Sequence, residues 1–185
     1  ASQLLLGLMC GGVALLFFSR IDYRVWKKYP PHFFELALFL SLLTFVPHVG
    51  LALKGASRWV SIGGFSFQPE EILKLATVLF LSALYAARFK SVNTIRGGLL
   101  PLVAIAGSAA LILIIQPNTA GVIVIGMASV GVFFAAGGRI SHMLLLGLAG
   151  VLAIGVAVYE RPYVLQRIET FLNQSADPQG AGYQI

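Results

Sequence analysis

The chain has 185 residues, of which 58% are hydrophobic and only 11% are charged. With a mean hydropathy of +0.87, it is too apolar for a soluble protein of this length. Its net charge of +6 is spread over the ends of apolar segments instead of forming one basic stripe, which indicates membrane topology and not nucleic-acid binding.

Six apolar segments follow one another along the chain, each of roughly 15 to 21 residues. About 20 apolar residues cross a hydrocarbon core of about 30 Å, and the shorter segments adjoin polar anchors that can extend them. We therefore predict an all-α polytopic membrane protein with six transmembrane helices, at residues 4–18, 33–53, 72–87, 99–115, 119–136 and 143–159. A short interfacial helix is expected after them, where apolar residues recur at helical spacing from Val164 to Leu172.

The basic residues distinguish the two sides of the membrane. Three alternate connections hold eight of the thirteen, namely Arg20, Arg24, Lys27, Lys28, Arg88, Lys90, Arg96 and Arg139. By the positive-inside rule these connections face the cytoplasm. Residues 55–69 and 116–118, the tail from Glu160 and both chain ends then face outward.

The segment 55–74 carries ionisable residues at or just inside an apolar slab. Such groups are costly there unless a bundle interior or an aqueous cavity receives them, so they are functional candidates. On a helix beginning near Pro69, Glu71 and Lys74 lie on one face and can pair. The same residues also fit a structural role, with Glu71 and Lys74 as a packing ion pair and Arg58 and Trp59 as interfacial anchors.

The tripeptide Gln116-Pro117-Asn118 divides two apolar segments on the same outward side. It fits a tight turn between antiparallel helices as well as a cavity wall. The three histidines are scattered and offer no metal-binding spacing, and no Ser or Cys is paired with a base. The residues alone therefore indicate no metal site and no complete catalytic group.

Four ordered motifs resemble the FtsW/RodA (SEDS) family, peptidoglycan glycosyltransferases that polymerise lipid II. They are DYRVWKK from Asp22, GASRWVSIGGFSFQPEEILK from Gly55, QPNTAG from Gln116 and RIETFLNQSADPQGAGYQ from Arg167. The resemblance covers essentially the whole chain. The first motif and the DPQGAGYQ ending are more similar to the FtsW branch of division and sporulation proteins than to RodA.

The resemblance implies a ten-helix fold, of which this chain matches helices two to seven. Residues 1–185 then form one SEDS-type domain, incomplete at both ends, with a helical bundle at 1–160 and the start of a large extracytoplasmic loop at 161–185. The family's proposed catalytic aspartate lies beyond Ile185 and is distinct from Asp177, which belongs to the DPxGxGY motif. No catalytic residue is therefore expected within the chain, and the 185 residues alone are expected to be inactive.

In the family, the motifs that line the outward cavity correspond here to the residues around Pro69 and Pro117. Two positions in this chain depart from the family's usual pattern. Glu70 stands where the family has Ser, and Asn118 stands where it has Asp, so a carboxylate is lost at 118. The sequence leaves open whether Glu70 restores negative charge near it. The residues expected to bind substrate are Arg58, Trp59, Gln68, Glu71, Lys74, Gln116 and Asn118.

The function implied is lipid II polymerisation for septal or cell-wall synthesis. Arg58 and Lys74 would stabilise the departing undecaprenyl pyrophosphate, and Glu71 would hold Lys74. A divalent cation is compatible with this chemistry, although no ligand cluster identifies one. The expected partners are lipid II, the lipid bilayer and a class B penicillin-binding protein, with no nucleic acid, at the division site of the bacterial inner membrane. Two alternatives remain: a lipid II flippase, and a non-catalytic scaffold for the penicillin-binding protein.

Overall fold

The computed structural model describes residues 2–20, 22, 28–47, 49–53, 56–62 and 65–160. It divides into two units, Ala1–Gly138 and Arg139–Ile185, each of which is described by itself. The interfacial helix predicted after residue 160, and with it Asp177, lies outside the described residues.

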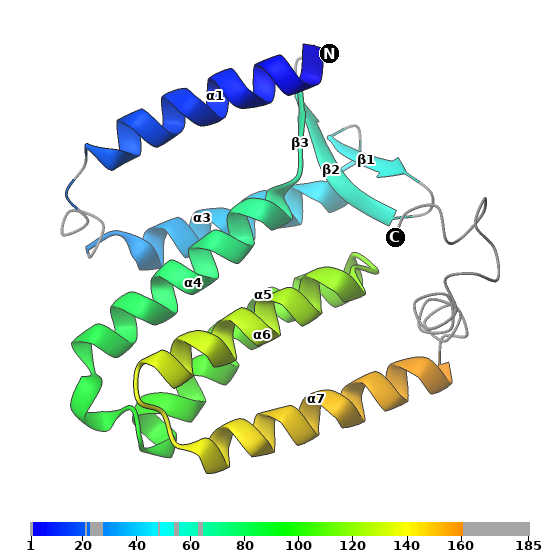
Figure 1. Ribbon diagram of the computed structural model, residues 1–185. Helices are drawn as coiled ribbons and strands as arrows, with labels where there is room; N and C mark the ends of the chain where they lie inside the picture. Colours follow the sequence, from blue (N-terminus) through cyan, green and yellow to red (C-terminus); the bar gives the residue numbers. More distant parts are fainter. Residues whose placement is uncertain are drawn as a thin grey trace, which may run out of the picture. The chain divides into compact units, whose positions relative to one another are not determined.

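Helices dominate the first unit, which contains α1 (Ser2–Ser19), α3 (Pro30–Leu42), α4 (Pro69–Ala87), α5 (Leu100–Ile115) and α6 (Thr119–Ala135). Helix α4 packs against α3, α5 and α6, and α5 packs against α6 (Figure 1). The second unit contains α7 (Ile140–Glu160). Five predicted helices therefore form within about three residues of their expected bounds.

Large apolar side chains occur on both the buried and the exposed faces of these helices. Leu73, Leu113 and Ile125 are buried in the bundle, whereas Leu111 and Met127 are exposed. A helix that is apolar all round belongs to a large core or to a membrane. By length and composition, residues Ile95–Ile115 are the one stretch in the described part that is long and apolar enough to cross a membrane, and Pro30–Phe45, Thr119–Ala135 and Ile140–Ala153 are shorter apolar helices.

The prediction of one continuous helix over 33–53 is wrong beyond Phe45. Helix α3 gives way to a 3-10 turn, η1 (Leu43–Phe45), and Val46 is then extended, with φ −78° and ψ 126°. Val46 precedes Pro47, and the proline ring disfavours a helical conformation in the residue before it. The chain can therefore leave the helix before its apolar segment ends.

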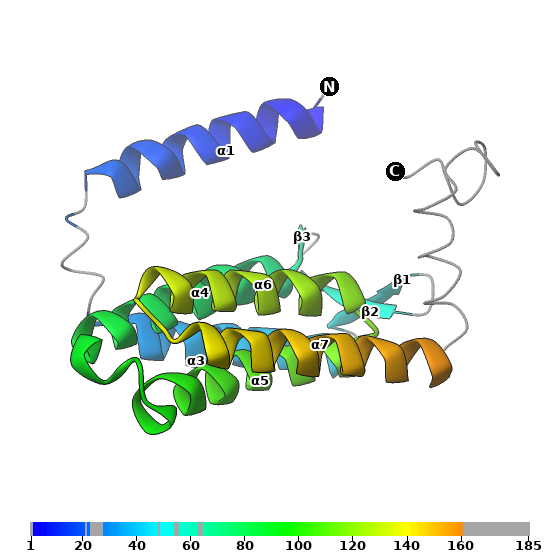
Figure 2. The same ribbon diagram turned by 60° about the horizontal axis from the view of Figure 1, so that its bottom comes forward.

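The end of the predicted helix 33–53 and the predicted outer loop after it form a small antiparallel sheet. Its strands are β1 (Gly50–Leu53), β2 (Ala56–Ile62) and β3 (Phe65–Phe67), in the order β1-β2-β3. Strand β2 contacts both η1 and α4, so the sheet lies at the end of the bundle where α3 finishes and α4 begins (Figures 1 and 2). The sequence signal was Gly63-Gly64 between the paired residues Ile62 and Phe65, because such dipeptides are typical of hairpins.

Two short elements connect α4 to α5 at the opposite end. They are a 3-10 turn, η2 (Phe89–Ser91), and one turn of π-helix, η3 (Ile95–Leu99). The Thr94 hydroxyl oxygen caps η3 by accepting a hydrogen bond of 3.0 Å from the Gly97 N–H. The bundle thus has a polar end that bears the sheet and a second end that bears these short turns.

Candidate functional site

Two helix starts bring the sequence motifs to the same end of the bundle. Helix α4 begins after Gln68, with Pro69 at its first position, as the sequence predicts. Helix α6 begins after Asn118, whose Oδ1 accepts a hydrogen bond of 3.1 Å from the Gly121 N–H. Because α4 and α6 pack together, the residues at these two starts form one polar cluster.

The centre of the cluster is Glu70, whose side chain is only 7% exposed. Its Oε2 accepts a hydrogen bond of 2.7 Å from Gln68 Nε2 and a second hydrogen bond from Asn118 Nδ2. Its Oε1 lies 3.6 Å from the ammonium nitrogen of Lys74. A buried carboxylate is costly unless it is paired and hydrogen-bonded, and Glu70 has both kinds of partner.

The predicted pair of Glu71 and Lys74 is present, with Lys74 Nζ 2.8 Å from Glu71 Oε1. The two carboxylates beside Lys74 differ sharply, because the Glu71 side chain is 64% exposed and that of Glu70 is buried. Sequence reasoning placed Glu71 in the site and left Glu70 out of it. The spacing from Glu70 to Lys74 is i to i+4, which favours an ion pair as much as i to i+3 does, so a signal was available.

Glu70 and Asn118, the two positions at which the sequence departs from the pattern it resembles, contact each other directly. The carboxylate absent at 118 is supplied at 70, and the amide at 118 donates to it. The sequence left open whether Glu70 brings negative charge close to Asn118, and the hydrogen bond between them answers that it does.

Arg58 reaches the cluster from strand β2. Its Nη2 donates a hydrogen bond to the carbonyl oxygen of Pro117, which ties the sheet to the turn before α6. Its Nε is buried without a hydrogen-bond partner among the described residues, and no described carboxylate forms an ion pair with it. Trp59, the next residue on the strand, is half-buried.

Gln116 belongs to a different buried contact. Its Nε2 donates to the carbonyl oxygen of Ser41 at 3.0 Å and to Thr44 Oγ1 at 2.9 Å, which joins the end of α5 to the end of α3. The Thr44 hydroxyl in turn donates to the Ser41 carbonyl oxygen. These bonds give Gln116 a structural role, and its role in substrate binding stays a prediction.

A glycine on α6 makes room for the Glu70 carboxylate. A Cβ atom added at Gly121 would lie 3.0 Å from Glu70 Cδ and 3.0 Å from Leu113 Cδ1, and would overlap Glu70 Oε1. Glycine therefore lets the carboxylate lie directly against the α6 backbone. Any side chain at this position would move Glu70 away from its partners.

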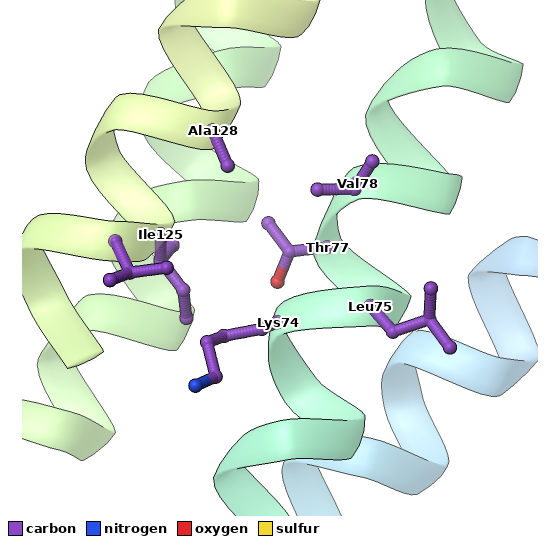
Figure 3. A pocket seen from close by; sticks show the side chains of 7 residues that line it. Lys74, Leu75, Thr77, Val78, Ile125 and Ala128 are labelled. Atoms are coloured by element: carbon purple, nitrogen blue, oxygen red, sulfur yellow. The ribbon is translucent and has the colours of Figure 1, made fainter. Parts of the chain in front are cut away.

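An apolar groove of about 270 Å³ runs between α4 and α6 beside the cluster. In Figure 3, Thr77 and Lys74 on α4 face Ile125 and Ala128 on α6. Lys74 is the one charged residue in its lining. The described residues contain no group of three or more His, Cys, Asp or Glu side chains placed to hold a metal ion, so the divalent cation compatible with the sequence has no assigned ligands in that part of the chain.

Comparison with known proteins places these features in context. The family model FtsW/RodA/SpoVE, described as "Cell cycle protein", matches residues 1–185. The chain is 35% identical to Stage V sporulation protein E of Bacillus subtilis, over 95% of this chain and 48% of the relative. It is 36% identical to a probable peptidoglycan glycosyltransferase FtsW of Nitrosococcus halophilus, over 96% of this chain and 46% of the relative.

A solved structure supports the fold. A chain from "Structural coordination of polymerization and crosslinking by a peptidoglycan synthase complex" superposes with a TM-score of 0.76 and 25% identity, over 97% of this chain and 52% of that chain. The helical membrane fold predicted from the sequence is thereby confirmed. The chain spans about half the length of the curated relatives it matches.

Proposed function

The chain belongs to the FtsW/RodA/SpoVE family of cell cycle proteins, and on that premise we propose that the complete protein is a peptidoglycan glycosyltransferase that polymerises lipid II. The observation that carries the proposal is the polar cluster at one end of the bundle. It joins an arginine that has no carboxylate partner among the described residues, the ion pair of buried Glu70 with half-buried Lys74, and a capping amide at 118, beside an apolar groove. This combination suits a substrate with a charged head and an apolar chain.

In the proposed reaction, a sugar 4-hydroxyl attacks the anomeric carbon of a second lipid-linked disaccharide. The new C1–O4 bond forms as the bond from C1 to the pyrophosphate oxygen breaks, and undecaprenyl pyrophosphate leaves with the electron pair. The hydroxyl proton goes to a general base, for which the family resemblance supplies an aspartate beyond Ile185. Cationic groups in this chain stabilise the negative charge that develops on the leaving group.

The two cations of the cluster differ in what they can offer to a pyrophosphate. Lys74 lies between Glu70 and Glu71, so most of its charge is already balanced. Arg58 makes a hydrogen bond to a neutral carbonyl and keeps further N–H donors for an anion. We therefore assign the main pyrophosphate contact to Arg58, and to Lys74 the orientation of the polar head at the mouth of the groove.

The proposed topology has six crossings that correspond to helices two to seven of a ten-helix fold, with the cluster on the outer side. It is supported by Arg88, Lys90 and Arg96, which are exposed at the end of the bundle opposite the cluster, as the positive-inside rule requires of a cytoplasmic end. We further propose the division site of the inner membrane as the location and a class B penicillin-binding protein as the partner.

The test is polymerisation of purified lipid II by the complete protein in detergent or in vesicles. We expect glycan strands from the wild type and a loss of at least about tenfold in turnover for Arg58→Ala, because one preorganised donor to the leaving group is removed. Arg96→Ala, an exposed arginine at the other end of the bundle, is the matched control and should retain full turnover.

Failure of the wild type to make strands would overturn the proposal, and a second assay then separates the alternatives. Movement of fluorescent lipid II across vesicles without strand formation would identify a flippase. Neither activity, with retained binding of a penicillin-binding protein, would identify a scaffold.

A further inference from the structure

We propose that Glu70 and Asn118 form a single carboxylate–amide unit that holds Lys74 in its working position, and that the unit operates with its one negative charge at either of the two positions. This makes Glu70 a positioning residue for the proposed reaction, on which the inference rests. The helical spacing to Lys74 suits Glu70 and Glu71 alike, and burial in the fold separates the two carboxylates.

The first support is the geometry around the carboxylate. Glu70 Oε2 accepts from both Gln68 and Asn118, and Oε1 faces Lys74 at 3.6 Å. Asn118 uses both ends of its amide, because Nδ2 donates to Glu70 and Oδ1 accepts from the Gly121 N–H. The pair therefore links the first turn of α4 to the first turn of α6.

The second support is the charge balance of a buried place. Both Glu70 and Asn118 are buried, and Lys74 is the one described cation that forms an ion pair with Glu70. A second carboxylate in contact with the first would leave two like charges that one shared ammonium, already bound to Glu71, cannot balance. The site therefore accommodates one carboxylate at these two positions. A site with no carboxylate is also unfavourable, because Lys74 would lose its buried partner.

The third support is that the hydrogen bond between positions 70 and 118 can form with the amide at either position and the carboxylate at the other. A carboxylate at 118 still accepts from the Gly121 N–H, and an amide at 70 donates to that carboxylate as Asn118 now donates to Glu70. The carboxylate at 70 lies directly against the α6 backbone, because a Cβ atom at Gly121 would overlap Glu70 Oε1. Exchange of the two groups preserves the number of charges, and the Gln68 amide keeps its hydrogen bond by turning so that its oxygen accepts from the second N–H of the amide at 70.

A set of variants of the complete protein tests the inference. The single substitutions are Asn118→Asp, which creates two carboxylates, and Glu70→Gln, which leaves none. The double substitution Glu70→Gln with Asn118→Asp exchanges the groups. The matched control is Glu35→Gln, alone and combined with Asn118→Asp, because Glu35 is an exposed carboxylate that lies on α3 and pairs with His32.

Two measurements are made on each variant: the midpoint of thermal unfolding in detergent, and kcat and KM for lipid II polymerisation. We expect each single substitution to lower kcat by at least about tenfold with little change in KM, since a displaced Lys74 no longer orients the polar head for attack. The exchange variant should recover kcat to within about threefold of the wild type, together with most of the lost midpoint, because the two sites couple directly. Adding Glu35→Gln to Asn118→Asp should restore neither kcat nor the unfolding midpoint.

The inference is overturned if the exchange variant is as impaired as the two singles combined, or if Glu35→Gln rescues Asn118→Asp equally. If the singles lower the midpoint but leave kcat per folded molecule unchanged, Glu70 is structural only and the positioning role fails. Should Asn118→Asp not fold, recovery of folded yield in the exchange variant is the same test. A wild type that unfolds cooperatively but polymerises no lipid II overturns the proposed function, while the midpoints still decide whether the unit exists.

Discussion

Helix α4 is held in the bundle by different chemistry at its two ends. At its start, the buried Glu70 carboxylate pairs with the half-buried Lys74, and Asn118 donates a hydrogen bond to that carboxylate from the start of α6. At its end, the Tyr85 ring packs on Phe133 with the ring centroids 5.7 Å apart, and the Tyr85 hydroxyl donates a hydrogen bond of 2.9 Å to the carbonyl oxygen of Gly98.

Both ends depend on a glycine that allows close approach. A Cβ atom at Gly121 would meet the Glu70 carboxylate, and a Cβ atom at Gly98 would lie 2.9 Å from Phe133 Cε2. Close packing is therefore common to both ends and does not mark the site. The distinguishing property is that one end desolvates charges and the other desolvates an aromatic ring and a hydroxyl.

This difference indicates which end of α4 serves the stability of the fold and which end serves function. The free energy lost when two charges leave water is often only partly offset by their mutual attraction, so a buried ion pair is weak evidence for a stabilising role. Aromatic packing with a satisfied hydroxyl is favourable without that penalty. The charged end of α4 is thus the end whose residues we expect to be needed for activity, and the aromatic end is the one we expect to be needed for the fold alone.

Removal of Lys74 should have the largest effect. Lys74→Met leaves the buried Glu70 carboxylate without its cation, and we expect a loss of about 3 kcal/mol in unfolding free energy together with loss of polymerisation. Thermal unfolding in detergent measures the first effect. Adding Glu70→Gln should restore much of the stability, whereas adding Glu71→Gln should not. Equal rescue by both would mean that the buried and exposed carboxylates are equivalent, against the structure.

The close approach at Gly121 provides the next test. Gly121→Ala forces Glu70 or Leu113 to shift, and we expect a destabilisation of about 1–3 kcal/mol with a parallel fall in turnover. Gly126, on the same helix, has open space around its Cα, so Gly126→Ala should be neutral or stabilising by less than about 1 kcal/mol. Indistinguishable unfolding midpoints for the two variants would contradict the packing described at Glu70.

At the aromatic end, Tyr85→Phe removes one hydrogen bond and keeps the ring. We expect a loss of about 1 kcal/mol, because the Gly98 carbonyl loses its partner. Turnover per folded molecule should stay at the wild-type value, since the change lies at the end of α4 away from the cluster. Lower turnover at unchanged folded yield would show that the two ends are coupled.

The smallest effect is expected at Glu71. Its pair with Lys74 is exposed, and such pairs contribute at most about 1 kcal/mol, so Glu71→Gln should shift the unfolding midpoint very little. The same carboxyl-to-amide change at Glu70 provides the direct comparison. If the Glu71 variant proves the less stable of the two, the assignment of Glu70 as the central carboxylate is wrong.

The sequence by itself determined the class of the protein and most of its helices. Hydropathy placed five helices near their true bounds, Pro69 marked the start of α4, and helical spacing predicted the pair of Glu71 and Lys74. These features depend on periodicity, capping and composition, which operate within a few residues along the chain. Two of the four family motifs, those from Gly55 and Gln116, likewise contain the residues that meet at one end of the bundle.

Only the tertiary structure decided which residues form the site. Asn118 contacts Glu70 across 48 positions, Arg58 contacts Pro117 across 59, and Gln116 is bound to Ser41 across 75. Each of these partners is fixed by how helices and strands pack, which no local pattern specifies. Burial likewise separates Glu70 from Glu71, because adjacent helical residues point about 100° apart and the packing of α6 covers one of them. The sequence showed two carboxylates next to a lysine, and the fold made one of them the centre of the cluster.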